Sequence, residues 1–351
     1  MDHMKTVTLP GLIDMHVHLR DPGQTHKEDF HTGTSAALTG GFTKIFDMPN
    51  NLKPIADRLA LQSKIKSAKS KIVCDVGFYF GSLGDNIEEF SVVKDDVWGI
   101  KLYLNQTTGD YRINIHILEK VMKNWSKKSL ILVHAEDDVI DDVVKAVRKY
   151  GNRVHVCHVS SKSELEPILE AKKDKLPITC GVTPHHLFLN EHDEKALGPY
   201  GIMKPSLKSK KDQDFLWKNL RHIDVIESDH APHTKKEKES AKLPFGVPGL
   251  ETTLPLLLSD NRITIQDIER LCYENPRKIL GLKSDQQTKI VVDLNAKYQI
   301  LNTNLRTKSG WSPFNGWKVK GKVQEVHIRG KKVFENGRVI AKPGSGQLLF
   351  P

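Results

Sequence analysis

Eight short runs rich in valine and isoleucine are spaced along the first two thirds of the chain, and helical patterns separate them. Strands that alternate with helices are typical of parallel βα units, whose sheets are buried on both faces. A count of eight favours a closed (β/α)8 TIM barrel over an open doubly wound sheet, and no GxGxxG motif follows the first run. We therefore predict an α/β fold with strands at residues 9–20, 44–50, 72–80, 97–104, 130–136, 154–159, 178–182 and 223–229.

The last third of the chain has a different pattern. Two further helices, at 249–258 and 265–282, are followed by short alternating strands with glycine turns at 290–294, 321–333 and 337–340. We expect these strands to form a small accessory β-patch with residues 5–9. The predicted organisation is a barrel at 10–285 and an accessory region made of 5–9 and 286–351. Helices of the barrel are predicted at 57–69, 87–93, 115–125, 138–150, 162–172 and 212–220, and residues 25–41 are predicted to be a loop followed by a helix.

Composition excludes several classes of protein. The 351 residues include 38% hydrophobic and 27% charged residues, as in ordinary soluble proteins, and we expect a cytoplasmic location. No apolar run approaches the roughly 20 residues that span a bilayer. Four widely spaced cysteines without a CxxC pair predict neither a disulfide framework nor a thiolate zinc finger. The net charge of +10 lies on scattered lysines without aromatic platforms, so we expect no nucleic acid and no membrane as partner, and a small anionic substrate instead.

Polar residues stand where the predicted strands end, which is where a βα barrel carries its catalytic groups. His16, His18 and Arg20 share one side of the first strand, because side chains two apart point the same way. One buried histidine is usually a satisfied core residue, but four histidines and an aspartate at strand ends are hard to explain that way. Neutral imidazoles and a carboxylate suit Zn²⁺, so we predict a catalytic metal site. The remaining polar residues in this pattern are Asn50, Lys101, His134, His158 and Asp229.

Lys101 needs a separate explanation, because it lies within an apolar strand. A buried ammonium is costly and repels a metal. Either the side chain extends to solvent or pairs with an acid, or its amine has reacted with CO2. The resulting carbamate would be a bridging carboxylate that holds two metals close together.

Six motifs follow one another along the chain. They are Arg20-Asp-Pro-Gly23, Met48-Pro-Asn50, Lys101-Leu-Tyr-Leu-Asn105, His155-Val-Cys-His158, Thr183-Pro-His-His-Leu187 and Ser228-Asp-His-Ala-Pro-His233. Together they resemble dihydroorotases of the metal-dependent amidohydrolase superfamily. The resemblance covers essentially the whole chain and is closest to the dihydroorotase domain of the multifunctional pyrimidine-synthesis protein of animals. It implies reversible cyclisation of N-carbamoyl-L-aspartate to L-dihydroorotate in de novo pyrimidine biosynthesis.

The same resemblance implies a site with two zinc ions. A metal-bridging hydroxide would attack the ring amide, and Asp229 would shuttle the proton between that hydroxide and the ring nitrogen. Arg20, Asn50 and His233 would bind the substrate, since arginine can fork onto a carboxylate and asparagine can both donate and accept. The implied metal ligands are His16, His18, carboxylated Lys101 and Asp229 about one zinc, and carboxylated Lys101, His134 and His158 about the other.

Three departures from the animal domains bear on the remaining candidate residues. The resemblance to those domains implies a third zinc, held by a cysteine and a glutamate. Cys157 stands at the position of that cysteine, but Gly181 stands at the position of that glutamate, so the third zinc is doubtful. Lys204 stands where the family has an arginine, and its backbone is a candidate substrate contact. In the loop after strand four, Thr107 is expected to cap the substrate. The next residue, Thr108, stands where the animal domains have a phenylalanine, so the aromatic side chain of that loop is missing. Phe245 is a further candidate substrate contact.

Two other functions stay open. A hydantoinase or dihydropyrimidinase would share the metals, but its substrate has no carboxylate to occupy Arg20. A catalytically silent scaffold domain is the alternative outside enzymology, although such domains usually lack ligands that this chain retains. The resemblance further leads us to expect a homodimer, free or joined to carbamoyl-phosphate synthetase and aspartate transcarbamoylase in a longer polyprotein.

Overall fold

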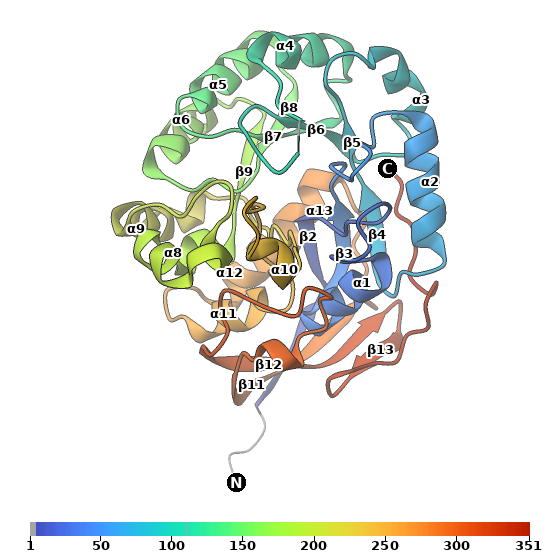
Figure 1. Ribbon diagram of the computed structural model, residues 1–351, viewed down its shortest axis with the longest axis vertical. Coiled ribbons are helices and arrows are strands. Elements are labelled where there is room, and N and C mark those ends of the chain that lie inside the picture. The colour runs from blue at the N-terminus through green and yellow to red at the C-terminus, as the bar shows by residue number, and fades with distance from the viewer. Residues whose placement is uncertain (1–4, 110) are drawn as a thin grey trace.

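The barrel strands lie in two parallel sheets that are arcs of one closed structure (Figure 1). This computed structural model describes residues 5–109 and 111–351. The first sheet contains β2 (Leu12–Val17), β3 (Phe42–Asp47) and β4 (Asp75–Phe78). The second contains β5 (Phe80–Gly81), β6 (Gly99–Tyr103), β7 (Leu130–His134), β8 (Arg153–Val156), β9 (Ile178–Val182) and β10 (Val225–Ile226).

Two seams join these sheets. At one seam only Tyr79 separates β4 from β5, so both belong to the third strand position. At the other, Val17 of β2 pairs in parallel with His230, and the amide of His18 donates to the carbonyl of His230 at 2.8 Å. The described strands thus occupy eight positions around a barrel, and the predicted (β/α)8 fold is confirmed.

Helices follow the strands and cover the outside of the barrel (Figure 1). α5 shows why such segments are helical: Ile140, Val143 and Val147 bury one face, and Gly151 ends the helix in the left-handed region at φ 73°. Acidic residues in its first turn and basic residues in its last complement the helix dipole. The helices that match predicted ones are α1 (Phe30–Thr39), α2 (Arg58–Lys69), α3 (Phe90–Val93), α4 (Ile115–Asn124), α5 (Val139–Tyr150), α6 (Lys162–Lys173), α9 (Lys210–Lys218) and α11 (Thr253–Ser259).

The structure differs from prediction in the shorter helices. The single helix predicted at 265–282 is divided into α12 (Ile265–Glu269), a π-helical turn (Arg270–Glu274) and α13 (Asn275–Leu280). Pro276 explains the division, because it has no amide hydrogen to donate to the preceding turn. Among the described residues, no helix has the length and apolar composition needed to cross a membrane. Short loop helices that were not predicted are α7 (Pro184–Phe188), α8 (Glu191–Leu197) and α10 (Lys235–Lys238).

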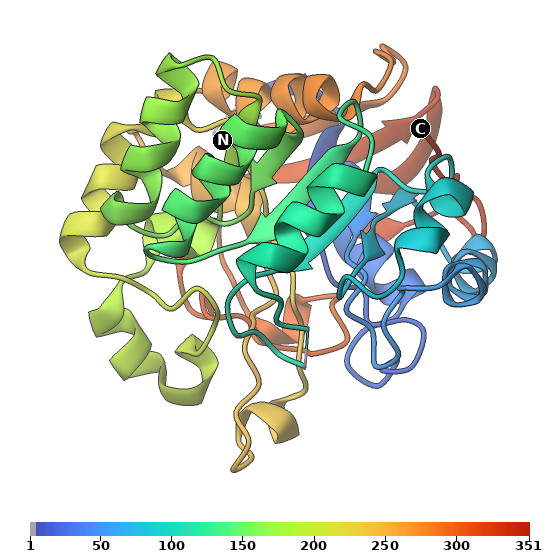
Figure 2. The same cartoon turned by 90° about the horizontal axis from the view of Figure 1, so that it is seen from above.

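The two ends of the chain form one antiparallel sheet beside the barrel, as predicted (Figure 2). Its strand order is β1-β11-β12-β13-β14, and Thr6 of β1 lies opposite Asp293 of β11. β11 is longer than the strand predicted at 290–294, because register shifts let it bend and continue. The single strand predicted at 321–333 is instead divided between β12 and β13. The strands are β1 (Thr6–Pro10), β11 (Lys289–Gln299), β12 (Lys318–Ile328), β13 (Lys331–Glu335) and β14 (Arg338–Val339).

The last residues of the chain return to the barrel wall. β4 is the edge strand of its sheet, and Leu348 pairs with its residue Val76 in parallel. The amide of Val76 donates to the carbonyl of Gln347 at 2.9 Å, and the Trp98 indole donates to the carbonyl of Leu349 at 2.9 Å. The C-terminal segment therefore acts as an extra strand where β4 has no other neighbour.

Gly346→Ala should destabilise the fold, because a Cβ at this position would lie 2.1 Å from the carbonyl oxygen of Cys74. We expect a loss of about 1–3 kcal/mol in the free energy of unfolding, as for other overpacked sites. Ser345→Ala, at the exposed neighbouring residue, is the control and should stay within about 0.5 kcal/mol. Urea denaturation measures both, and equal midpoints would show that the segment is not packed as described.

Candidate metal centre and substrate pocket

Two histidines at the end of the first barrel strand meet an aspartate that follows the last strand. His16 Nε2 lies 3.3 Å from Asp229 Oδ1, and His18 Nε2 lies 3.1 Å from the same oxygen. All three side chains are buried. The pairing of β2 with the chain just after β10 brings these residues together, although His18 and Asp229 are 211 positions apart.

A second group of predicted ligands lies next to the first. His134 Nδ1 lies 3.1 Å from His158 Nε2, and the His158 ring centre lies 5.1 Å from that of His16. Lys101 is buried close enough for its charge to act on His16, His134 and His158, and its Nζ donates to Cys157 Sγ at 3.0 Å. The six predicted metal ligands are thus gathered at one end of the barrel.

This donor set fits a divalent metal. His16 Nδ1 and His158 Nδ1 are buried and have no hydrogen-bond partner among the described residues. Burial, and then the charge of Lys101, lowers the pKa of His16 to about 4. Burial also lowers the pKa of His18, His134 and His158. The imidazoles are therefore neutral at pH 7, which is the form that donates a lone pair to zinc.

Two carboxylates that the sequence analysis did not assign lie against these histidines. Glu136 Oε1 is 3.0 Å from His134 Nε2, and Glu227 Oε2 is 3.6 Å from His16 Nδ1. Carboxylates commonly orient metal-binding histidines through the nitrogen that does not face the metal. A signal was present, because Glu227 stands two residues before Asp229 within the run predicted as the eighth strand, where such residues share a side.

Glu227 also occupies the space that Gly181 leaves open. A Cβ at Gly181 would lie 2.6 Å from the carboxyl carbon of Glu227. A longer side chain on β9 would therefore compete with Glu227 for the same volume. His16, Cys157 and Glu227 each offer a ligand atom, and these atoms lie within 4.8 Å of one another.

Asn50 is held in the site by the turn after β3. Its Oδ1 lies 2.6 Å from His18 Nδ1. The buried amine of Lys64, on α2, donates to the carbonyl of Met48 at 2.7 Å and to Asn51 Oδ1 at 2.9 Å. Lys64 therefore fixes the turn that presents Asn50, a role that the helical pattern of this segment did not indicate.

The opposite side of the site is rich in N–H donors. Lys27 Nζ donates to His233 Nδ1 at 3.3 Å, so the ring proton resides on His233 Nε2, which donates to the carbonyl of Phe245 at 3.0 Å. Arg20 Nη2 lies 3.1 Å from this Nε2, and Arg20 Nε donates to the carbonyl of Pro232 at 3.2 Å. Two donor groups this close are stabilised by an anion, which agrees with the predicted carboxylate site.

The cavity above the histidines has about 20 Å³, enough for roughly one water molecule. Its mouth is narrowed by Thr108, whose hydroxyl donates to the Phe245 carbonyl at 3.1 Å and accepts from the Phe245 amide at 3.0 Å. The Phe245 loop carries α10 and projects beyond its end of the molecule (Figure 2, gold). A six-membered ring needs these loops to separate. The lining residues are His16, His18, Arg20, Asn50, Tyr103, Thr107, Thr108, His134, His158, Lys204, Asp229, Ala231, Phe245 and Gly246.

Most predicted substrate residues line this cavity, but three predicted site residues do not. His233 is fully buried beside Arg20, and Cys157 and Lys101 are buried in contact with each other. Thr108 lacks the aromatic side chain of the animal domains, yet the ring of Phe245 lies against the same cavity. The aromatic contribution therefore comes from a different loop.

Lys64→Met should destabilise the protein strongly, because it leaves the buried Asp47 carboxylate, 2.8 Å from Lys64 Nζ, without its cation. We expect a loss of about 3–5 kcal/mol in the free energy of unfolding. Lys66→Met, on an exposed position of the same helix, is the matched control and should cost less than about 0.5 kcal/mol. Chemical denaturation compares them, and similar losses in the two variants would contradict the role given to Lys64.

Comparison with known proteins identifies the family. Residues 7–179 match the Amidohydrolase family. The chain is 37% identical over 367 residues to the dihydroorotase of Pyrococcus furiosus, covering 98% of this chain and 85% of that protein. It is 42% identical over 352 residues to the multifunctional protein CAD of Squalus acanthias, covering 99% of this chain. The chain spans only 16% of the length of that CAD protein.

Solved structures agree on the fold. An L-hydantoinase (dihydropyrimidinase) from Arthrobacter aurescens superposes with a TM-score of 0.93 at 24% identity, covering 99% of this chain and 89% of that one. The inactive dihydroorotase-like domain of the Chaetomium thermophilum CAD-like multifunctional protein gives 0.84 at 25% identity, with 98% and 99% covered. The hydantoinase likeness shows the fold alone, whereas the curated relatives show the family. On these grounds, the chain belongs to the dihydroorotase family of amidohydrolases.

Proposed function

We propose that this chain is a zinc-dependent dihydroorotase that interconverts N-carbamoyl-L-aspartate and L-dihydroorotate in pyrimidine biosynthesis. The observation that carries the proposal is the gathering of the histidines, Lys101 and Asp229 next to Arg20 at one end of the barrel. A metal set alone would suit many cyclic amide hydrolases. A buried guanidinium beside it suits a ring that bears a carboxylate.

In the proposed metal site, two zinc ions would be held by the four histidines, Asp229 and a carbamate on Lys101. An ammonium among neutral imidazoles would repel a cation, whereas a carbamate adds two oxygen ligands at the same place. The burial of Lys101 supports this proposal, because a free ammonium is costly in such a place. Zinc bound here would acidify a water molecule and polarise the ring carbonyl.

The residues of the chain divide the remaining work. Asp229 takes the proton of the attacking water and delivers it to the leaving ring nitrogen; in the biosynthetic direction it protonates the departing hydroxyl. Arg20 forks onto the substrate carboxylate, and His233 Nε2 donates beside it once the Phe245 loop moves away and releases its hydrogen bond. Asn50 contacts His18 and lies in the turn that Lys64 fixes, so its amide meets the ring in one orientation. Thr107, Lys204 and Phe245 close the pocket around the substrate.

Two alternatives make different predictions. A hydantoinase would turn over dihydrouracil or hydantoin faster than dihydroorotate, and a silent scaffold domain would turn over none of them. The retained ligand set favours an active site over the scaffold. Steady-state assays with all three substrates on zinc-loaded protein decide the matter, and faster turnover of dihydrouracil than of dihydroorotate would refute the proposal.

Arg20→Met should weaken binding of dihydroorotate selectively. Loss of a charge-assisted hydrogen bond of about 1.5–3 kcal/mol corresponds to a rise in KM of about 10- to 100-fold. The kcat/KM for dihydrouracil should change by less than about threefold, because this substrate has no carboxylate and therefore makes no such contact with Arg20. Arg58→Met, on exposed α2 surface, is the control. Equal losses for both substrates would place the carboxylate elsewhere.

We also infer that Glu227 provides the carboxylate of a third metal position. It would replace the glutamate that the animal domains have at the position of Gly181. The support is the volume exchange between Gly181 and Glu227, together with the cluster of His16, Cys157 and Glu227. His16 Nδ1 is the unpartnered atom on the side of Glu227. The competing role for Glu227 is to orient His16 by accepting its proton.

Cobalt substitution separates these roles for Glu227. A thiolate bound to Co²⁺ gives a near-ultraviolet charge-transfer band, which Cys157→Ser should abolish and Cys180→Ser, at another buried thiol, should keep. Metal analysis should give about three ions per chain in the parent protein and about two in Glu227→Ala. If the parent protein binds two ions and shows no band, Glu227 only orients His16.

The assembly of the protein is also a proposal. The match to a small part of CAD supports a dihydroorotase unit of a longer multifunctional protein, beside carbamoyl-phosphate synthetase and aspartate transcarbamoylase. The match along most of the archaeal dihydroorotase supports a free-standing enzyme equally well. We propose a homodimer in either setting, in the cytoplasm.

A further inference from the structure

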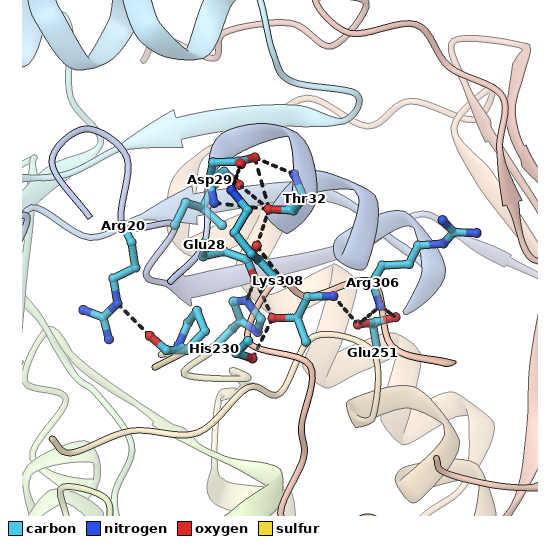
Figure 3. Close-up of polar contacts among 12 residues, drawn as sticks. Arg20, Glu28, Asp29, Thr32, His230, Glu251, Arg306 and Lys308 are labelled. Atoms are coloured by element: carbon cyan, nitrogen blue, oxygen red, sulfur yellow. Dashed lines mark hydrogen bonds and ion pairs between the residues drawn. The ribbon is translucent and has the colours of Figure 1, made fainter. Parts of the chain in front are cut away.

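Glu28 is a buried carboxylate outside the metal and substrate sets, and it joins three distant segments (Figure 3). It accepts hydrogen bonds from the hydroxyls of Thr32, on α1, and Thr307. The amide of Lys308 donates to its two oxygens at 3.2 and 3.3 Å. Its Oε2 also lies 3.3 Å from His230 Nε2. Every one of these groups is a donor, so an ionised carboxylate satisfies them all.

The contact with His230 has a defined direction. The amide of Gly249 donates to His230 Nδ1 at 3.2 Å, so Nδ1 carries the lone pair of the ring. The proton of the neutral ring is then on Nε2, which donates to Glu28. His230 is therefore held at both ring nitrogens and cannot turn without losing a buried hydrogen bond.

His230 directly follows Asp229, whose backbone is in the left-handed region at φ 43°. A non-glycine residue adopts this conformation only when its surroundings impose it. Upstream, the amide of Ser228 donates to both carboxylate oxygens of Asp14 at 3.2 Å. Downstream, the side chain of His230 is the anchor, with Glu28 as its buried partner. Buried carboxylates therefore hold the residues on both sides of Asp229: Asp14 holds Ser228, and Glu28 holds His230.

We propose that Glu28 is a positioning residue for Asp229 that acts through His230, and that Thr307 and Lys308 complete this support. The proposal rests on the proposed function, in which Asp229 moves the proton. The segment carrying Thr307 lies between β11 and β12, so the accessory sheet contributes to the catalytic geometry without touching the substrate. Its contribution is the set of donors that keep Glu28 in place.

Glu251 provides a matched control, because it holds the same segment without touching His230 (Figure 3). Its oxygens accept the amides of Arg306 at 2.9 and 3.0 Å and of Thr307 at 3.0 Å. Because Glu251 Oε2 accepts both amides, a glutamine whose oxygen takes that place keeps both hydrogen bonds. Glu251→Gln should therefore keep the segment in place.

Glu28→Gln is the first test, since it sets an amide NH2 against groups that are all donors. We expect kcat for dihydroorotate to fall by about 10- to 100-fold, as for other residues that orient ligand groups. KM should change by less than about threefold and zinc content should stay the same, because Arg20 and the imidazoles are not altered. Glu251→Gln should keep kcat within about twofold. A Glu28→Gln variant with the parent kcat would overturn the proposal.

Two substitutions of His230 make the test independent of how well Glu28→Gln folds. His230→Asn keeps an acceptor for Gly249 but cannot reach Glu28, whereas His230→Gln keeps a donor toward Glu28. We expect the asparagine variant to lose activity like Glu28→Gln and the glutamine variant to lose less. The double variant Glu28→Gln/His230→Asn should be no slower than the slower single variant, because both remove one interaction. If the fold-losses in kcat of the two single variants multiply in the double variant, the proposal is overturned. Absence of turnover in the parent protein would instead refute the proposed function.

Discussion

The pairing of the first barrel strand with the chain after the last is the interaction on which the site depends. Parallel strands place all their carboxyl ends at one rim, so closure of the barrel converts residues far apart in sequence into neighbours. The contact between Val17 and His230 closes the ring and, in the same step, brings His16 and His18 to Asp229. Without this seam the ligands would lie at opposite edges of an open sheet.

Closure places unusual demands on the backbone at the strand ends. Arg20, His158 and Asp229 all have positive φ, although none is glycine. Such conformations cost on the order of 1–3 kcal/mol each and persist only where the surroundings enforce them. The surroundings here are buried carboxylates: Glu227 accepts the amide of His158 at 2.5 Å, and Glu28 holds the residue after Asp229. The polar interior beneath the site thus supports the residues exposed to the cavity.

Much of the fold was predictable because each signal is local. Valine-rich strands and amphipathic helices each have a characteristic periodicity in the sequence. The histidines were recognisable because they are polar residues at the ends of apolar strands. Glu227, Lys64 and Glu28 were missed for a physical reason: a buried charged residue in the sequence looks like a surface residue until its partners are known. The partners of Glu28 include Thr307, 279 residues away. The π-helical turn before Pro276 and the return of the C-terminal segment to β4 also depend on packing rather than local pattern.

By itself, the sequence determined the alternation of strands and helices, the accessory strands at the two ends, and the metal-binding residue types at strand ends, since these follow from periodicity and side-chain chemistry. Only the tertiary structure decided which nitrogen of each histidine faces which neighbour, and which carboxylate fills the space beside Gly181. Those choices depend on distances of a few ångströms between residues on different strands. His16 and His18 were recognisable from their spacing, but their geometry with Asp229 exists only once the barrel is closed.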